Sequence, residues 1–233
     1  GAAVIPVEMI VQMREKLGFE TVVTGYGLTE GSGLATMCRH DDDPETIAKT
    51  SGRAMPGMEV KIVNEQNEEV SRGDPGEIIV RGYNVMKGYL DDPEQTAQAI
   101  NDEGWLHTGD IGVMDHEGNI SITDRKKDMY INGGFNVYPA EVESLMLAHP
   151  DIGQVSVVGV SDQRMGEVGC AFVVRATGRQ PDPEEIIGWC RNEMANYKCP
   201  RYIQFIETLP LNASGKVLKY ELRERAHKLL GLM

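Results

Sequence analysis

The sequence predicts a mixed α/β and α+β chain that a short charged segment divides into two parts. Residues 58–123 hold short apolar runs separated by turn residues, which is typical of a small antiparallel β subdomain. Residues 129–233 instead alternate apolar strands with helices that begin near prolines. Between these parts, Arg125 to Asp128 is a run of four charged residues that no apolar core could hold. We therefore predict a first part (1–124), a connector (125–128) and a second part (129–233).

Composition limits the classes of partner. The 233 residues carry a net charge of −13, which argues against nucleic acid, because phosphate binding needs a basic face. From Arg191 onward, Lys and Arg outnumber Asp and Glu by eight to four, a balance that suits an anionic ligand such as CoA, although charge alone favours an ordinary solvated helix. No apolar run approaches the length of a membrane span, and no signal peptide is present, so we expect a cytoplasmic protein without an integral membrane segment.

The cysteines and histidines give no sign of a metal centre. Four cysteines are scattered along the chain without the spacing of a zinc site, and the five histidines are equally dispersed. We expect reduced thiols.

The first fifty residues predict a helix, a strand and a glycine loop. Residues 1–20 read as a loop and then a helix, with Met9, Ile10, Met13 and Leu17 at helical spacing. A strand is predicted at residues 21–24, which would put GYGLTE (25–30) at the carboxyl end of a strand, where α/β sheets bind ligands. The third glycine of a dinucleotide fingerprint is replaced by glutamate. From the residues alone, a glycine turn with an exposed acid is the preferred interpretation of this loop.

Short strands dominate the next seventy residues. We predict strands at 58–63, 77–81 and 120–123, and a short helix capped by Asp92 that runs through Ala99. The stretch WLHTGD (105–110) is predicted to lie on the loop before a strand that starts at Ile111. Taken alone, Asp110 also fits a turn residue that caps backbone amides.

The second part opens with a hairpin and continues as α+β. Strands at 129–131 and 135–138 flank a turn at 132–134, and Pro139 begins a helix to about His149. Further strands are predicted at 155–160, 168–174 and 202–206, with helices from Pro183 and after Gly215. A surface hairpin after a linker explains residues 124–143 as well as any functional reading does.

Four stretches occur together in a fixed order: GYGLTE, WLHTGD, DRKKDMYINGGFNVYPAEVE (124–143) and LPLNASGK (209–216). In this order they resemble the adenylate-forming (AMP-binding) superfamily, which includes acyl-CoA synthetases, peptide-synthetase adenylation domains and firefly luciferase. The resemblance implies that residues 1–124 end a large N-terminal AMP-binding domain, that 125–128 form a hinge, and that 129–233 form a small α+β lid. It also implies that the chain starts in the middle of a longer protein.

The resemblance assigns the first loop to ATP. Tyr26, between Gly25 and Gly27, would stack on adenine, and Thr29 would bond the α-phosphate. Glu30 would help to hold Mg²⁺, and a carboxylate is a hard ligand suited to that hard cation.

Two further contacts are implied for the ribose and one for the reacting groups. Asp110 would accept both ribose hydroxyls, which suits an acceptor with two oxygens. Arg125 would be the second ribose contact, although the family usually has Gly-Arg where this chain has Asp124-Arg125. Lys216 would contact the carboxylate and the α-phosphate during adenylation; taken alone, it is an ordinary surface lysine. The implied catalytic residues are thus Lys216, Thr29 and Glu30.

The same resemblance assigns the hinge and the coenzyme A face. The lid would rotate about Lys127 and present Asn132, Gly133 and Gly134 to CoA, where glycines let a thin pantetheine arm pass close to the backbone.

The implied activity is an ATP-dependent ligase that joins a fatty-acid-like or ring-bearing carboxylic acid to CoA through acyl-AMP, with ATP/AMP, Mg²⁺ and coenzyme A bound. Residues 1–233 alone are expected to be inactive. Two alternatives remain: an enzyme that loads a carrier protein, and a non-catalytic binding module derived from a ligase. Because a binding module needs none of them, the joint presence of Glu30, Asp110, Arg125 and Lys216 favours an enzyme.

Overall fold

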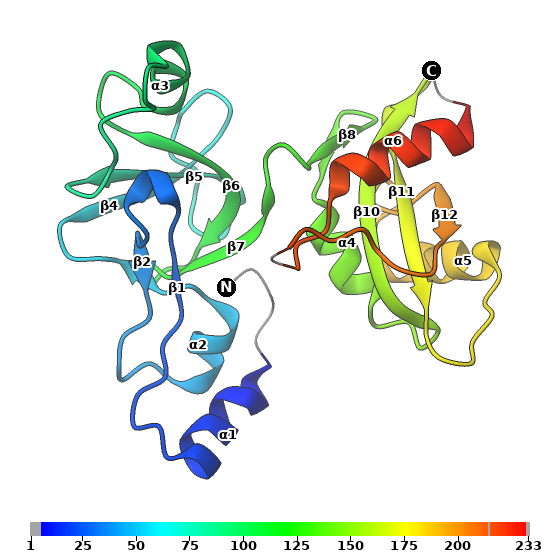
Figure 1. Ribbon diagram of the computed structural model, residues 1–233, viewed down its shortest axis with the longest axis horizontal. Helices are drawn as coiled ribbons and strands as arrows, with labels where there is room; N and C mark the ends of the chain where they lie inside the picture. The colour runs from blue at the N-terminus through cyan, green and yellow to red at the C-terminus, as the bar shows by residue number, and fades with distance from the viewer. Residues whose placement is uncertain (1–5, 214, 232–233) are drawn as a thin grey trace. The chain divides into compact units, whose positions relative to one another are not determined.

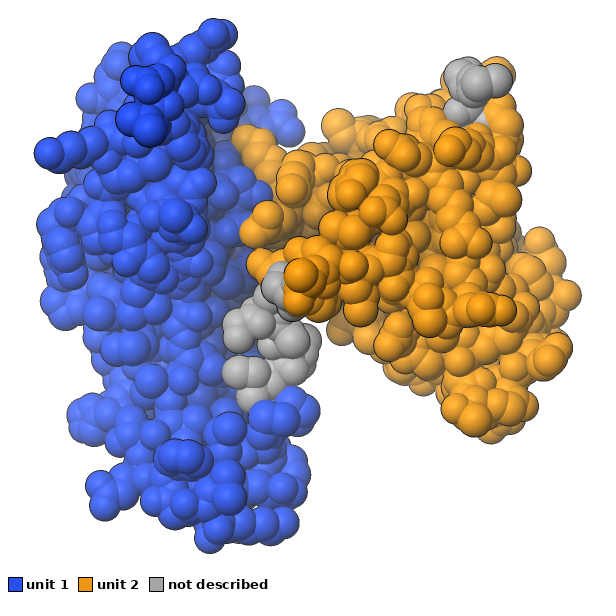
Figure 2. Space-filling view, in the orientation of Figure 1, with its two compact units in different colours: residues 1–123 blue, residues 124–233 orange. Residues whose placement is uncertain are grey.

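The computed structural model describes residues 6–213 and 215–231, which form two compact units, 1–123 and 124–233 (Figures 1 and 2). The elements of the first unit are α1 (Val7–Leu17), β1 (Gly25–Tyr26), the 3₁₀ helix η1 (Thr29–Gly31), β2 (Thr36–Met37), α2 (Pro44–Lys49), β3 (Arg53–Ala54), β4 (Met58–Val63), β5 (Gly76–Gly82), α3 (Pro93–Ala99), β6 (Leu106–Met114) and β7 (Ile120–Arg125), whose last two residues belong to the second unit. The second unit continues with β8 (Tyr130–Asn132), β9 (Phe135–Val137), α4 (Pro139–Met146), β10 (Ile152–Asp162), β11 (Gly166–Arg175), α5 (Pro183–Glu193), β12 (Tyr202–Phe205) and α6 (Lys219–Leu230).

Two antiparallel sheets organise the first unit. One has the order β1-β2-β3 and the other β4-β5-β6-β7. The apolar run of β5 supplies the centre of the larger sheet, and Ile78 and Val80 are fully buried there with Leu106 and Ile120. The predicted antiparallel β subdomain is therefore confirmed. So is the short helix α3, where the Asp92 carboxylate accepts the Gln95 N–H.

The strand predicted at residues 21–24 is wrong. Pairing begins only at Gly25, because the facing strand β2 offers just Thr36 and Met37. Thr24 serves a different purpose: its hydroxyl lies 2.8 Å from the Ile47 carbonyl and 2.9 Å from the Thr50 carbonyl, at the end of α2. The GYGLTE loop thus starts inside a strand rather than after one.

The first helix forms as predicted over residues 7–17, and residues 1–5 of the predicted loop lie outside the described residues. Of its four spaced apolar residues only Ile10 is buried, in a small cluster with Cys38 and Ile47, while Met9 and Leu17 are exposed.

The second unit is a five-stranded sheet with helices on both faces. Its order is β10-β11-β8-β9, and β12 pairs in parallel with β11. Alternation along β10 divides the core: Val155 and Val157 pack on one side with residues of α4 and α5, whereas Val158 and Val160 pack on the other with α6 (Figure 1). The predicted α+β arrangement is confirmed, although α4 ends at Met146, three residues before the predicted His149.

Candidate functional site

Two predicted residues from distant motifs meet inside the first unit. The Tyr26 hydroxyl donates to Asp110 Oδ2 at 2.6 Å, and the two residues are only 7 and 8 % exposed. Tyr26 comes from β1 and Asp110 from β6, and the Tyr26 ring packs against Met58 and Ile78. An aromatic ring and a carboxylate are therefore held side by side by the core itself.

Asp110 lies within a strand, so the predicted loop position of WLHTGD is wrong. Residues 106–110 all belong to β6, and the register of its pairing with β5 shifts between Ile79↔His107 and Glu77↔Ile111. Between these two pairs, one residue of β5 (Ile78) thus faces three of β6 (108–110), and the surplus forms a bulge in which Gly109 has a φ of +69°. Because a bulge bends a strand and re-aims its side chains, the motif keeps its special geometry without leaving the sheet.

Glu77, which sequence reasoning missed, supports this bulge. Its buried carboxylate accepts the Gly109 N–H at 3.2 Å and lies 3.0 Å from His107 Nδ1. The sequence did contain a signal for this role: Glu77 is an acid within the otherwise apolar run GEIIV (76–80). A carboxylate that is buried in such a strand requires polar partners. Glu77 and His107 hold the segment on which Asp110 lies.

Thr29 and Glu30 lie on η1, directly after β1. Glu30 Oε1 accepts the Tyr89 hydroxyl at 3.0 Å, and the Glu30 carbonyl accepts the Met86 N–H at 2.7 Å. Partial desolvation and the neighbouring carboxylate raise the pKa of Tyr89, which keeps this hydroxyl a donor. Thr29 is exposed at the surface of the loop.

The glycines of this loop serve close backbone packing. A Cβ on Gly27 would lie 1.9 Å from the Gly33 carbonyl oxygen, and one on Gly25 would lie 2.8 Å from that of Thr36. These positions admit only glycine because the chain folds back on itself there.

Asp124 and Arg125 open the second unit in contrasting environments. The buried Asp124 carboxylate accepts the Arg125 N–H at 2.6 Å and the Ala140 N–H at 2.7 Å. Burial raises the pKa of Asp124, and these two hydrogen bonds oppose that rise. Arg125 and the predicted pivot Lys127 are exposed. The structural role of Asp124 was missed, because the sequence marked it only as a departure from glycine.

The turn between β8 and β9 matches its glycine pair. Gly133 and Gly134 have φ values of +60° and +87°, as a tight hairpin turn requires. Asn132 is buried; its Nδ2 donates to the Tyr197 carbonyl at 2.7 Å, and its buried Oδ1 accepts no hydrogen bond within the described residues. The Gly133 N–H donates to the Met165 carbonyl at 2.8 Å, which fixes the turn against the β10–β11 hairpin.

Lys216 lies at the end of a small loop that Asn212 closes. The Asn212 side chain accepts the Lys216 N–H at 2.9 Å, and the Asn212 N–H donates back to the Lys216 carbonyl at 2.9 Å. A bridge between Leu211 and Val217 completes the loop, and the Lys216 side chain is exposed. Ser214 of the motif lies outside the described residues.

The predicted site residues therefore form separate sets. Those at 25–30 and 110 lie in the first unit, and those at 125, 127, 132–134 and 216 lie in the second. No group of three or more His, Cys, Asp or Glu side chains suited to a metal ion occurs among residues 6–213 and 215–231. Over the same ranges, no helix has both the length and the apolar character needed to cross a membrane.

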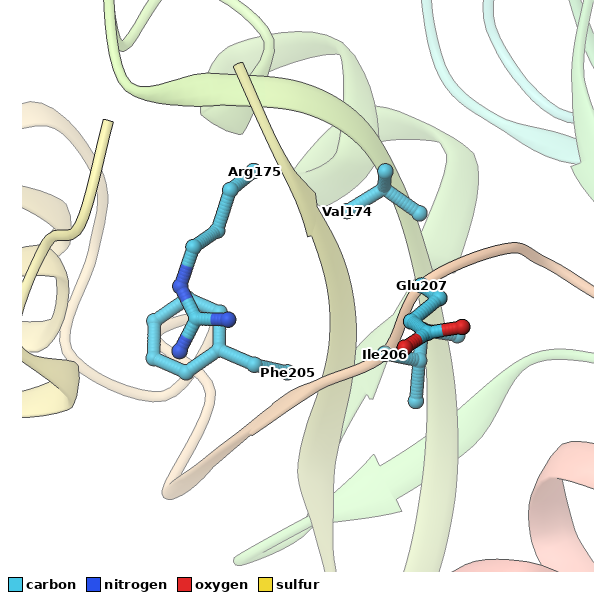
Figure 3. A pocket seen from close by; sticks show the side chains of 5 residues that line it. All are labelled: Val174, Arg175, Phe205, Ile206 and Glu207. Carbon is cyan, nitrogen blue, oxygen red and sulfur yellow. The ribbon is translucent and has the colours of Figure 1, made fainter. Parts of the chain in front are cut away.

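A shallow pocket of about 340 Å³ lies elsewhere in the second unit, at the ends of β11 and β12. The Arg175 guanidinium stacks over the Phe205 ring at 3.7 Å, and Val174, Ile206 and Glu207 complete the lining of the pocket (Figure 3). None of the predicted site residues lines this pocket.

Comparisons with known proteins agree with the motifs. The AMP-binding enzyme family matches residues 1–90, and the AMP-binding enzyme C-terminal domain matches residues 141–216. The chain is 52 % identical over 224 residues to 3-[(3aS,4S,7aS)-7a-methyl-1,5-dioxo-octahydro-1H-inden-4-yl]propanoyl:CoA ligase of Rhodococcus jostii (strain RHA1), covering 96 % of this chain and 41 % of that protein.

Solved structures give the same result. ATP-bound MatB from Rhodopseudomonas palustris is 36 % identical, with a TM-score of 0.85 over 96 % of this chain and 44 % of its own. The o-succinylbenzoate CoA synthetase MenE from Bacillus subtilis, bound to its acyl-adenylate intermediate, is 34 % identical, with a TM-score of 0.80 over 96 % of this chain and 45 % of its own. The chain thus spans less than half the length of these proteins. In sequence and in fold, the chain belongs to the AMP-binding enzyme family.

Proposed function

We propose that residues 1–233 act as the C-terminal part of an ATP-dependent ligase that joins a carboxylic acid to coenzyme A through an acyl-AMP intermediate. In this proposal residues 1–124 complete the AMP-binding domain, 125–128 form the hinge and 129–233 form the lid. The observation that carries the proposal is the buried pair of Tyr26 and Asp110. A flat ring beside a two-oxygen acceptor fits a nucleoside, whose base stacks and whose ribose donates two hydroxyls.

Glu30 and Thr29 are proposed to meet the phosphates. Tyr89 holds one Glu30 oxygen, which fixes the carboxylate on η1. A fixed carboxylate fits Mg²⁺, which is usually bound by one or two carboxylates together with substrate phosphates. Mg²⁺ would neutralise charge on the phosphate oxygens. The Thr29 hydroxyl, exposed on the same loop, can donate to the α-phosphate.

In the first half-reaction a carboxylate oxygen of the substrate attacks the α-phosphorus of ATP. A phosphorus–oxygen bond forms, the bond to pyrophosphate breaks, and acyl-AMP results. Negative charge grows on the α-phosphoryl oxygens, and a positioned cation stabilises it. Lys216 supplies that cation from a loop that Asn212 keeps closed. Arg125 contacts the ribose together with Asp110.

In the second half-reaction the lid turns about Lys127, and the CoA thiol attacks the acyl carbon. A carbon–sulfur bond forms, the bond between the acyl carbon and the phosphate oxygen breaks, AMP leaves with that electron pair, and the thiol proton passes to solvent. The turn at Asn132, Gly133 and Gly134 would receive the pantetheine arm. The buried Asn132 Oδ1 fits one of the amide N–H groups of that arm.

The acid is proposed to be ring-bearing or fatty-acid-like. The Rhodococcus relative acts, by its name, on a propanoate attached to a bicyclic ring system. A carrier-protein thiol is the alternative acceptor, and the names of the CoA ligase relatives favour CoA over it.

A panel of carboxylic acids tests the proposal in the full-length protein. Each acid is incubated with ATP and Mg²⁺, with and without CoA, while pyrophosphate and thioester are measured separately. We expect pyrophosphate release to depend on the acid, and thioester formation to depend on CoA. Pyrophosphate release without any CoA thioester would favour a carrier-protein acceptor. If no acid releases pyrophosphate, the proposal fails.

A further inference from the structure

Arg223 of α6 contacts the predicted pivot directly. Its Nη2 donates to Asp128 Oδ1 at 2.7 Å and to the backbone carbonyl of Lys127 at 3.3 Å. The Asp128 side chain is only 13 % exposed and that of Arg223 is 32 % exposed, so the contact is partly shielded from water. One arginine therefore binds both the residue proposed to turn and the residue after it.

The peptide bond explains why this contact matters. The Lys127 carbonyl and the Asp128 N–H belong to one rigid plane, so a bond to the carbonyl orients the whole plane. The second bond, to the Asp128 carboxylate, restrains rotation just beyond that plane. Arg223 does not contact the backbone that precedes this plane. The φ and ψ angles of Lys127 and of the residues before it can therefore still change.

The helix that carries Arg223 is firmly seated in the second unit. Leu222 and Ala226 of α6 are buried against the sheet, and Lys219 forms an ion pair with Glu143 at 2.9 Å. The Lys216 loop ends immediately before this helix. Through Arg223, the Lys127–Asp128 peptide plane is therefore connected to the second unit, which also carries Lys216.

We propose that Arg223 is a positioning residue that ends the hinge at the Lys127–Asp128 peptide, so that the lid turns at Lys127 and carries the Lys216 loop with it as one body. This inference rests on the proposed two-step ligase. Without Arg223, the same turn could be spread over Asp128 and Met129, and the lid would arrive less accurately.

A double-mutant cycle in the full-length protein tests this role. Lys127→Pro removes rotation at the pivot and should slow thioester formation from supplied acyl-AMP by about 100-fold. In an Arg223→Met background the turn can move to later residues, so the same proline should slow that step by only about 10-fold or less. Arg225→Met is the matched control, because Arg225 is an exposed arginine of the same helix and its loss changes the net charge equally. In that background Lys127→Pro should keep its full effect.

Adenylation, measured as pyrophosphate release, reports folding in every variant. If Arg223→Met does not fold, Asp128→Asn weakens the same contact from its other end and takes its place in the cycle. An equal proline effect in both backgrounds overturns the role of Arg223, since a residue that only adds stability would not relieve a blocked pivot. A wild-type protein that makes no thioester from acyl-AMP overturns the proposed function instead.

Discussion

The two units hold their candidate residues in opposite ways. In the first unit, Tyr26 and Asp110 are buried and bonded to each other, and Glu30 is bonded to Tyr89. In the second unit, Lys127 and Lys216 are exposed on short turns whose backbone, rather than the side chain, is fixed. The first arrangement suits a preformed nucleotide site, which binds without paying for side-chain ordering. The second suits groups that must enter and leave an active site.

Lys216→Ala is the sharpest test of this contrast. We expect adenylation to fall by about 10²- to 10³-fold, as when a donor to a developing negative charge is removed. Thioester formation from supplied acyl-AMP should stay near the wild-type rate. Thermal unfolding should not change, because the side chain is exposed. Lys228→Ala, another exposed lysine, is the control. Equal losses in both half-reactions would contradict a role for Lys216 in one step only.

Tyr26→Phe should behave in the opposite manner, with an effect on both stability and binding. The ring remains, but Asp110 loses a buried donor, which should lower the free energy of unfolding by about 1–3 kcal/mol. Misplacement of the carboxylate should raise the KM for ATP about tenfold, the equivalent of 1.4 kcal/mol. Calorimetric unfolding and initial rates measure the two effects. Tyr83→Phe, at a site 76 % exposed, should change neither quantity. Unchanged unfolding in Tyr26→Phe would mean that the pair is not structural.

Two buried cysteines, one in each unit, allow the resistance of the two units to local unfolding to be compared. Cys38 lies in a small cluster with Ile10 and Ile47, whereas Cys170 lies in the interior strand β11. Burial raises the pKa of Cys170 to about 12, so at pH 8 it remains a protonated thiol until its surroundings open. Brief pulses of iodoacetamide at increasing urea should therefore alkylate Cys38 before Cys170. The reverse order would show that the second unit opens first.

Sequence reasoning predicted the second unit best. Its helices and strands follow strong apolar periodicity, such as the run from Val155 to Val160, and prolines mark the starts of α4 and α5. The four motifs identified the family because they specify backbone turns as well as side chains. Gly133 and Gly134 are examples, since both have positive φ.

Pairing across long distances in the chain could not be predicted. The strand at residues 21–24 failed because a strand needs a neighbour, and local propensity says nothing about whether one is present. The bulge at Gly109 is set by the register between β5 and β6, which the sequence of one strand does not encode. The contacts of Glu77 with Gly109 and of Asp110 with Tyr26 depend on the same tertiary arrangement.

Several hydrogen bonds join residues before Lys127 to residues after it, and they would stabilise one conformation of the proposed hinge. The Asp124 carboxylate accepts the Ala140 N–H at 2.7 Å, and the Asp128 and Met129 amides donate to the Arg125 carbonyl at 2.9 and 3.2 Å. On the proposed mechanism, turning at Lys127 breaks these bonds, so the lid occupies discrete conformers rather than a continuous range.

A hydrogen bond to a charged group contributes about 1.5–3 kcal/mol, enough to bias two populations by about 10- to 100-fold. The AMP-binding family usually has glycine at position 124, and a glycine has no carboxylate to accept the Ala140 N–H. On the proposed mechanism, the Asp124 side chain would touch no substrate, yet it would help to set the ratio of the two lid conformers that serve the two half-reactions.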